Sequence, residues 1–595
     1  MKIAYRNRTL EQVLTGVKAV ASVMIVVSFA LRFGFYEPPL PVGLLVGVLV
    51  GMLFIFVGGK LIRLFNAQSK REYLVANWYE IPMLTALTVV LVGAGRWFGR
   101  AEPSQIQHWA IALYLIIDVT IKFFMLCVRL AATGKDPTRV LVASFIVLIL
   151  TGAALLTLPK ATPGRASLPF VDALFTSTSA TCVTGLAVKD TGTSFTLMGQ
   201  LVILALIQLG GLGIVILGAV LALLLGQALS VRESAAIQDL LSEGTLGRIN
   251  RMVVFVFAAT ALFELLGAAA LLHLWNDVPG RTLDTQQQWY YSIFHAISAF
   301  CNAGFGLFSD NLVSYNRCWE VYLVICPLIV LGGLGFGVLY DLGGVVLDRA
   351  SRFCKRFIYR SCPVFQPAPR RMWLQTKIVL AVTVCLIITG TLALFAFEKL
   401  TGQGPAARNF SLLDALFQSI TARTAGFNSV DIGALSDPSK FILILLMYIG
   451  GSPGGTAGGI KTVTFVVVLM AVIATLRRRD DVEIFNRSVS LLIVLRAITV
   501  AVLFVMALFG ATLVLCITEA SSHFTMMQIF FEVASALGTV GLSTGITPAL
   551  TTAGKLIIIL VMLTGRLGPL TLLAALAFNA KPVRYSYPDE AIVVG

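Results

Sequence analysis

The amino-acid sequence predicts an all-α membrane protein with four pseudo-repeated helix–pore loop–helix units around one central pore, preceded by about four N-terminal transmembrane helices. Composition is the first reason: of 595 residues, 57% are apolar and 13% charged, and the mean hydropathy is +0.88, which favours a bilayer over water. About twelve apolar stretches reach the roughly 20 residues that a membrane-crossing helix needs. The last eight of them recur in pairs, each pair enclosing a half-length apolar segment.

Four leading spans are predicted at about 13–33, 41–65, 81–98 and 108–130. The first spans of the four pairs lie at about 138–158, 252–274, 375–397 and 489–517, and the second spans at about 198–225, 320–347, 440–475 and 554–579. A fixed period of this kind indicates structural repeats. The chain therefore divides into an N-terminal extension, 1–137, and four repeats, 138–250, 251–374, 375–488 and 489–595.

The half-length segments align without gaps on one glycine each: Gly185, Gly304, Gly426 and Gly541. Ten positions earlier stand Phe175, Phe294, Leu416 and Phe531, and six positions earlier stand Ser179, Ser298, Ile420 and Ser535. Glycines in packed membrane helices are common. Four glycines in register, each between a half-length apolar segment and a full span, favour a repeated loop that enters the membrane instead.

Backbone carbonyls can replace the hydration shell of a potassium ion where four extended loops meet at one axis. Glycine allows the close approach and the positive φ angles that such loops need, and a short helix that ends at the loop directs its negative end toward the ion. The predicted ion-binding residues are Val183, Thr184, Gly185, Asn302, Ala303, Gly304, Thr424, Ala425, Gly426, Thr539, Val540 and Gly541. Arg423, just before the third set, is expected to brace the loop from behind.

A second glycine-rich segment lies within the third repeat. Six glycines and Pro453 fall between Gly450 and Gly459, flanked by apolar runs, so the helix is predicted to break at membrane depth. Irregular backbone is tolerated there only where it lines water or is buried in protein. The predicted gating residues are Gly450, Gly451, Ser452, Pro453, Gly454, Gly455, Thr456, Ala457, Gly458, Gly459, Lys461 and Arg566. The alternative is a glycine-rich packing seam.

Two of these residues carry charge and have alternative roles. Arg566 lies in an otherwise apolar span, where a charge is costly and usually functional or paired. It either repels cations as a barrier in the pore or supports the broken loop through its five donors. Lys461 either takes part in the loop or extends to the cytoplasm.

Loop charges orient the chain. Residues 348–371 hold seven basic residues and one acidic residue, and three arginines begin at Arg477, so these loops are predicted to be cytoplasmic. The half-length segments then enter from the outer side, and both termini lie in the cytoplasm. The net charge of +15 comes from such loops, which argues against nucleic acid as a partner. Four histidines without metal-ligand spacing argue against an enzyme.

Residues 138–595 resemble the Trk/Ktr/HKT superfamily of potassium transporters, and most closely the bacterial TrkH and KtrB membrane subunits. The segments that carry the resemblance are Ala180–Leu186, Phe300–Phe305, Arg423–Asn428 and Gly450–Lys461. It implies one pore per chain, a homodimer in the bacterial inner membrane, an intramembrane gating loop at 450–461 and a cytosolic nucleotide-binding ring similar to TrkA or KtrA. The tail Tyr585–Glu590 resembles the part that approaches this ring.

The chain itself contains no nucleotide motif and no cofactor is expected in it, so ATP or ADP is expected on the partner, with potassium as the substrate. The four leading spans depart from the eight or ten spans of related subunits, which leaves the role of residues 1–137 open. Two alternatives remain: a sodium-permeable or sodium-coupled member of the superfamily, and the potassium-binding subunit of an ATP-driven pump. In the plant branch of this superfamily a serine in place of the first aligned glycine goes with sodium preference, so the resemblance implies potassium for a chain with glycine at all four positions.

Overall fold

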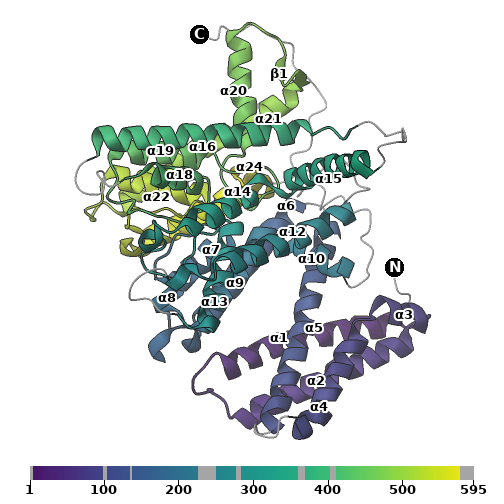
Figure 1. Cartoon of the computed structure of the whole chain (residues 1–595). Helices are drawn as coiled ribbons and strands as arrows, with labels where there is room; N and C mark the ends of the chain where they lie inside the picture. Colours follow the sequence, from purple (N-terminus) through teal and green to yellow (C-terminus); the bar gives the residue numbers. More distant parts are fainter. Residues whose placement is uncertain are drawn as a thin grey trace, which may run out of the picture.

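The computed structural model (Figure 1) describes most of the chain as helix. The described residues are 5–97, 103–133, 137–165, 167–224, 249–276, 283–358, 369–402 and 410–576. Within them, seven helices are long and apolar enough to cross a membrane, or up to ten if each bent helix pair counts as one span. The predicted all-α membrane fold is confirmed, and the predicted cytoplasmic tail lies outside the described residues.

The N-terminal extension forms a separate helical bundle, drawn in purple at the bottom of Figure 1. Its helices are α1 (Arg8–Phe33), α2 (Val42–Asn66), α3 (Lys70–Ala76), α4 (Glu80–Trp97) and α5 (Pro103–Thr133). Ala21, Ile25, Leu49, Phe56 and Leu115 lie in its buried core. The bundle is joined to the rest of the molecule chiefly along α5, which packs against α10 (Ile214–Leu224) of the first repeat.

The four repeats share one order of elements: a long helix, a short pore helix and a broken second span. The long helices are α6 (Pro137–Leu156), α12 (Ile249–Ala270), α16 (Leu374–Thr401) and α21 (Leu491–Thr518). The pore helices are α7 (Phe170–Thr181), α13 (Thr285–Phe300), α18 (Leu412–Thr421) and α22 (Met526–Gly538). The second spans comprise α9 (Leu197–Leu212) with α10 (Ile214–Leu224), α14 (Cys326–Leu334) with α15 (Phe336–Ile358), α19 (Asp437–Tyr448) with α20 (Thr462–Leu476), and α23 (Thr552–Leu567) with α24 (Pro569–Leu576).

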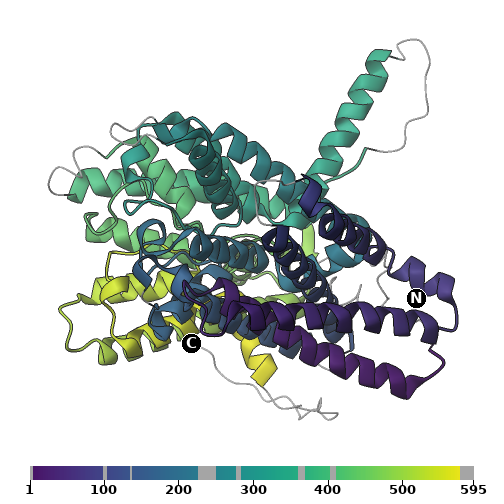
Figure 2. The ribbon, with the colours of Figure 1, turned by 90° about the horizontal axis from the view of Figure 1, so that it is seen from below.

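Every second span is broken, whereas the sequence predicted a break only in the third repeat. Gly213, Gly335 and Gly568 have φ angles of 83°, 85° and 83°, and a left-handed residue ends an α-helix. The second repeat bends by 104° and the fourth by 97° at these breaks. In Figure 2, α15 projects outward from the body as a result. In the third repeat the whole segment between α19 and α20 is non-helical, as predicted.

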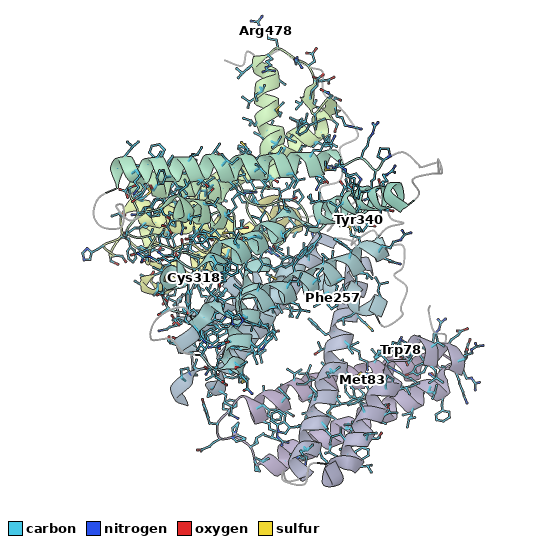
Figure 3. All side chains as sticks on the ribbon, viewed as in Figure 1. Trp78, Met83, Phe257, Cys318, Tyr340 and Arg478 are labelled. Atoms are coloured by element: carbon cyan, nitrogen blue, oxygen red, sulfur yellow. The ribbon has the colours of Figure 1, made fainter. Side chains whose placement is uncertain are left out.

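Smaller elements connect these helices. They are α8 (Thr191–Ser194), a π-helical turn at Val321–Ile325, and short 3-10 turns at Pro159–Ala161, Pro163–Arg165, Leu274–Asn276, Val313–Tyr315 and Thr547–Ala549. Beyond α20, β1 (Val482–Ile484) pairs antiparallel with β2 (Arg487–Val489). Figure 3 shows Arg478 at the tip of this projection, far from Trp78 and Met83 in the N-terminal bundle. The division of the chain at 137, 250, 374 and 488 stays a prediction.

Candidate functional site

The four aligned glycines lie in a closed ring. A Cβ atom added to Gly185 would lie 2.5 Å from the carbonyl oxygen of Ala303, and one added to Gly304 would lie 2.7 Å from that of Ala425. A Cβ atom on Gly426 would meet the oxygen of Val540, and one on Gly541 that of Thr184, which returns to the first repeat. Each glycine thus faces the residue just before the next glycine, and no side chain fits between them.

Backbone conformation also repeats around this ring. Each glycine has a positive φ, and the residue two positions earlier is left-handed as well: Val183 (φ 56°), Asn302 (58°), Thr424 (80°) and Thr539 (49°). Alternation of positive and negative φ turns successive peptide planes over, so that neighbouring carbonyls can point to the same side, whereas in an ordinary strand they alternate. The ring can therefore concentrate carbonyl oxygens, which is the chemistry of a cation cage.

Hydroxyl groups at the ends of the pore helices hold these loops. The Ser179 and Ser535 Oγ atoms accept from the backbone N–H groups of Gly185 and Gly541, at 3.1 Å and 3.0 Å. In the other two repeats the hydroxyl donates instead to the carbonyl that follows the glycine. Ser298 donates to Phe305 at 2.8 Å, and Thr421 donates to Phe427 at 2.6 Å. The same kind of support therefore occurs in all four repeats.

The gap-free alignment is off by one residue upstream of the third glycine. The supporting hydroxyl belongs to Thr421, five positions before Gly426, and not to Ile420. The aromatic ring equivalent to Phe175 belongs to fully buried Phe417, and not to Leu416. In the first repeat Thr184 N–H donates to Ser179 O, whereas in the third Ala425 N–H donates to Thr421 O. The third pore helix is thus joined to its loop by a turn one residue shorter.

The glycine-rich loop of the third repeat contacts the second and fourth repeats directly. Ser452 N–H donates to Gly333 O at 2.9 Å, and Phe336 N–H donates to Gly454 O at 3.1 Å, which joins the loop to the break in the second repeat. A Cβ atom on Gly458 would strike the Thr539 side chain in the fourth repeat. The loop therefore lies against the base of the glycine ring, next to the breaks in the second spans.

Arg566 links the loop to the first repeat. Its guanidinium donates to the carbonyl oxygens of Thr456 in the loop and Gly210 in the first repeat, and to that of Gly211 at 3.2 Å. Of the two predicted roles, loop support matches these contacts. Lys461 Nζ donates to Ala457 O at 2.7 Å, so this side chain folds back onto the loop.

The structure also reveals supporting residues that the sequence analysis missed. Lys555 in α23 pairs with Asp172 in α7 at 2.7 Å, which joins the fourth repeat to the first. Gln208 in α9 donates to Glu264 in α12 at 3.2 Å, and Cys301 lies beside them. Polar residues within apolar helices were the available signal, but partners from different helices cannot be paired from one sequence.

Four broken-helix repeats that meet at a ring of glycines define a class of helical membrane protein. The family model for TrkH, described as a cation transport protein, matches residues 107–582. The chain therefore belongs to the TrkH family of cation transport proteins.

Similar proteins support the assignment of this chain to the TrkH family. Ktr system potassium uptake protein B of Bacillus subtilis is 40% identical over 467 residues, which cover 77% of this chain and 97% of that protein. Potassium/sodium uptake protein NtpJ of Enterococcus hirae is 33% identical, with 77% and 97% covered. The solved structure of the potassium transporter TrkH from Vibrio parahaemolyticus matches with a TM-score of 0.57 at 18% identity, covering 84% of this chain and 98% of that one. That likeness supports the fold.

Proposed function

We propose that this protein takes up potassium through the ring around Gly185, Gly304, Gly426 and Gly541. The observation that carries the proposal is the closed ring in which each glycine faces the carbonyl group before the next glycine. Relatives that align over nearly their whole length are named potassium uptake proteins. The proposed ion ligands are the backbone carbonyls of the twelve predicted residues, and no side-chain chemistry is required.

Transport follows from electrostatics. A potassium ion leaves its hydration shell at the ring, where carbonyl oxygens replace water, while the C-terminal ends of the four pore helices add negative potential. Hydroxyl groups such as that of Ser298 hold the loops in the required shape. Repeated sites of moderate strength let the ion leave as well as enter, so the ion crosses without a covalent step.

Flux through purified protein in liposomes tests the proposal, with potassium and sodium gradients set independently. We expect potassium flux well above that of protein-free liposomes, and a smaller sodium flux. A second candidate, sodium-permeable or sodium-coupled transport, is favoured by the Enterococcus relative, which is named a potassium/sodium uptake protein. Equal sodium flux, or potassium flux that requires a sodium gradient, would support this second candidate. Absence of both fluxes would contradict transport.

We further propose that the loop at 450–461 is the gate. It lies against Thr539 at the base of the ring, and Arg566 ties it to the first repeat. If Arg566 released the carbonyl groups that it binds, the loop could move away from the ring, because its glycines allow several backbone conformations. The loop can work as a gate only if some interaction biases the equilibrium between its two arrangements, one under the ring and one displaced from it.

That bias is proposed to come from a partner. By family resemblance, the protein acts as a homodimer in the cell membrane, with both termini in the cytoplasm, under a cytosolic ring that binds ATP or ADP. Light scattering of the purified protein tests the dimer. Nucleotide should alter potassium flux only when the ring protein is added, and an effect on this chain alone would contradict the assignment of nucleotide to the partner.

A further inference from the structure

A buried carboxyl group in the fourth repeat holds the segment that follows the glycine ring. Glu532 belongs to the pore helix α22, nine positions before Gly541, and its side chain is fully buried. Ser543 Oγ donates to its Oε2 at 2.9 Å, and Thr547 Oγ1 donates to its Oε1. Among the described residues no basic side chain pairs with it. One hydroxyl donor on each oxygen suits an ionised carboxylate, which only accepts hydrogen bonds.

The segments that follow the four ring glycines pack on one another and form a second layer next to the ring, here called the mouth. Three contacts between successive repeats build it: Gly192 with Leu307, Leu312 with Asn428, and Gly433 with Thr544. Because the chain passes from each ring glycine directly into this layer, an ion that enters or leaves the ring on this side passes the mouth. Thr544 lies between the two hydroxyl partners of Glu532, so this carboxyl group supports the mouth directly.

The pore-helix position of Glu532 is polar and buried in every repeat. With the one-residue offset of the third repeat, its members are Thr176, His295, Gln418 and Glu532. His295 Nε2 accepts from Leu307 N–H at 3.4 Å, and Gln418 Nε2 donates to Ser429 Oγ at 3.5 Å. Three of the four repeats therefore connect this position to the mouth, and only the fourth places a carboxyl group there.

A buried carboxylate without a basic partner favours a cation nearby, because the Coulomb attraction is strong where water is excluded. The ligands of the ring are neutral carbonyls, so they leave the charge of a bound cation uncompensated. We propose that Glu532 is a positioning residue for the transported cation, and that its negative charge raises the affinity of the ring and mouth for potassium. Its hydrogen bonds to Ser543 and Thr547 keep the mouth in shape.

This inference rests on the proposed function, since it concerns the cation of that site. Glu532 touches no ion and acts through its electric field. A charge that acts at a distance attracts sodium and potassium alike. Glu532 therefore sets affinity, whereas the ratio of potassium to sodium flux depends on the ring carbonyls.

Potassium binding to the purified full-length protein, measured by calorimetric titration with choline as the background cation, tests the charge apart from transport. Glu532→Gln keeps the size of the side chain and removes the charge, so we expect the Kd for potassium to rise about threefold or more. Glu532→Asp keeps the charge on a shorter side chain and should bind potassium more tightly than the glutamine variant. A purely structural role predicts the reverse order, because glutamine still reaches the two hydroxyl groups and aspartate does not.

Flux through liposomes adds a second readout. Glu532→Gln should raise the KM for potassium and leave the ratio of potassium to sodium flux nearly unchanged. Glu519→Gln is the matched control, because Glu519 is another buried carboxyl group of the fourth repeat. It accepts from Thr551 Oγ1 at 2.6 Å and from Ser522 Oγ at 2.9 Å, at the start of α23 and not at the mouth. Its change to glutamine should leave potassium binding close to that of the unaltered protein.

Thermal unfolding shows which variants are folded. If Glu532→Gln is not, Gln418→Glu decides the question, since it adds a carboxylate at the equivalent position of the third repeat and should lower the Kd for potassium. An unchanged Kd in either folded variant, an equal loss in Glu519→Gln, or weaker binding by Glu532→Asp than by Glu532→Gln would overturn the proposal. A protein that binds potassium with the expected order of affinities but moves none would refute the proposed uptake alone.

Discussion

A β-branched residue in the left-handed region is rare, yet Val183, Thr424 and Thr539 all adopt it two residues before a ring glycine. The buried helices around them hold this conformation, whose intrinsic cost is of order 1–3 kcal/mol per residue. Strain that recurs at equivalent places of a repeat indicates a shape kept for function. Glycine at the next strained position could be recognised from the sequence, but a strained valine or threonine could not.

Gly304→Ser should lower the ratio of potassium to sodium flux, because a Cβ atom would press on Ala425 O and φ of 67° disfavours any side chain. The carbonyl cage would then widen or lose a member. Tracer flux in liposomes measures the ratio. Gly510→Ser is the control, since a Cβ atom there meets nothing within 4 Å. An unchanged ratio in folded Gly304→Ser protein would contradict the assignment of the ring as a filter.

Arg566→Ala should raise potassium flux in the absence of the regulatory partner. The change removes the donors to Thr456, Gly210 and Gly211 and leaves the loop without its link to the first repeat. Arg566→Lys should give an intermediate increase, because an ammonium lacks the planar fork that reaches several carbonyls. Flux below that of the unaltered protein would instead indicate that Arg566 supports the open pore.

At the scale of elements, the sequence predicted which segments are long helices and which are short pore helices better than it predicted where a helix is interrupted. The run from Gly450 to Gly459 is too rich in glycine for a helix, so its break was predicted. Gly210–Gly213 and Gly332–Gly335 are equally compatible with a tight helix contact, and only the positive φ of Gly213 and Gly335 shows that these helices end. Both explanations hold in part, since Gly210 and Gly332 also pack against the pore-helix carbonyls of Thr181 and Phe300.

Deletion of residues 452–457 should raise potassium flux and reduce its dependence on the partner. The deletion removes the loop's contact with Gly333 through Ser452 and the Arg566 acceptor on Thr456, so nothing would hold the segment under the ring. A packing seam predicts the opposite, because loss of contacts should reduce stability and flux together. Flux normalised to folded protein separates the two, and lower flux with intact partner dependence would exclude the gate.

The N-terminal bundle contains a buried ionic network that supports a stability prediction. Asp118 is fully buried in α5 and lies 2.9 Å from Lys60 in α2 and 2.5 Å from Lys122. Asp118→Asn should lower the free energy of unfolding by about 3 kcal/mol, since it leaves the buried ammonium group of Lys60 without its nearest carboxylate. Asp437→Asn, where the side chain is 73% exposed in its pair with Lys440, should cost under about 1 kcal/mol. Thermal and denaturant unfolding measure both, and equal effects would contradict the network's role.

For the whole molecule, closure of the four repeats into one ring depends on contacts between its beginning and its end. The Asp172–Lys555 pair and the approach of Gly541 to Thr184 join the fourth repeat to the first. The repeat in the sequence predicted a pseudo-symmetric arrangement, and that prediction needed only spacing. The residues that fasten the ring differ between repeats, so they follow no period and appear only in the structure.

Hydrogen bonds between helix ends show which ends lie on the same side of the molecule. Lys160 N–H donates to Gly34 O at 3.0 Å, so α1 and α6 end on the same side. Arg139, near the start of α6, donates to Ala575 O in α24 at 3.1 Å. The beginnings of α1 and α6 and the end of α24 therefore share the opposite side. The tyrosine hydroxyl of Tyr290, near the start of α13, donates to Gln200 at the start of α9 at 2.9 Å.

Charge predicts which side is cytoplasmic, because basic residues concentrate at 348–371. A reporter fused after Arg371 should be cytoplasmic, and one inserted near Asp284, at the start of α13, should be outside. Labelling of single cysteines by a membrane-impermeant reagent in intact cells, compared with opened cells, measures both positions. Replacing all nine native cysteines first keeps the signal specific. Opposite labelling would invert the topology, and with it the direction from which ions enter the ring, while labelling of both positions from one side would contradict the re-entrant path of α13 itself.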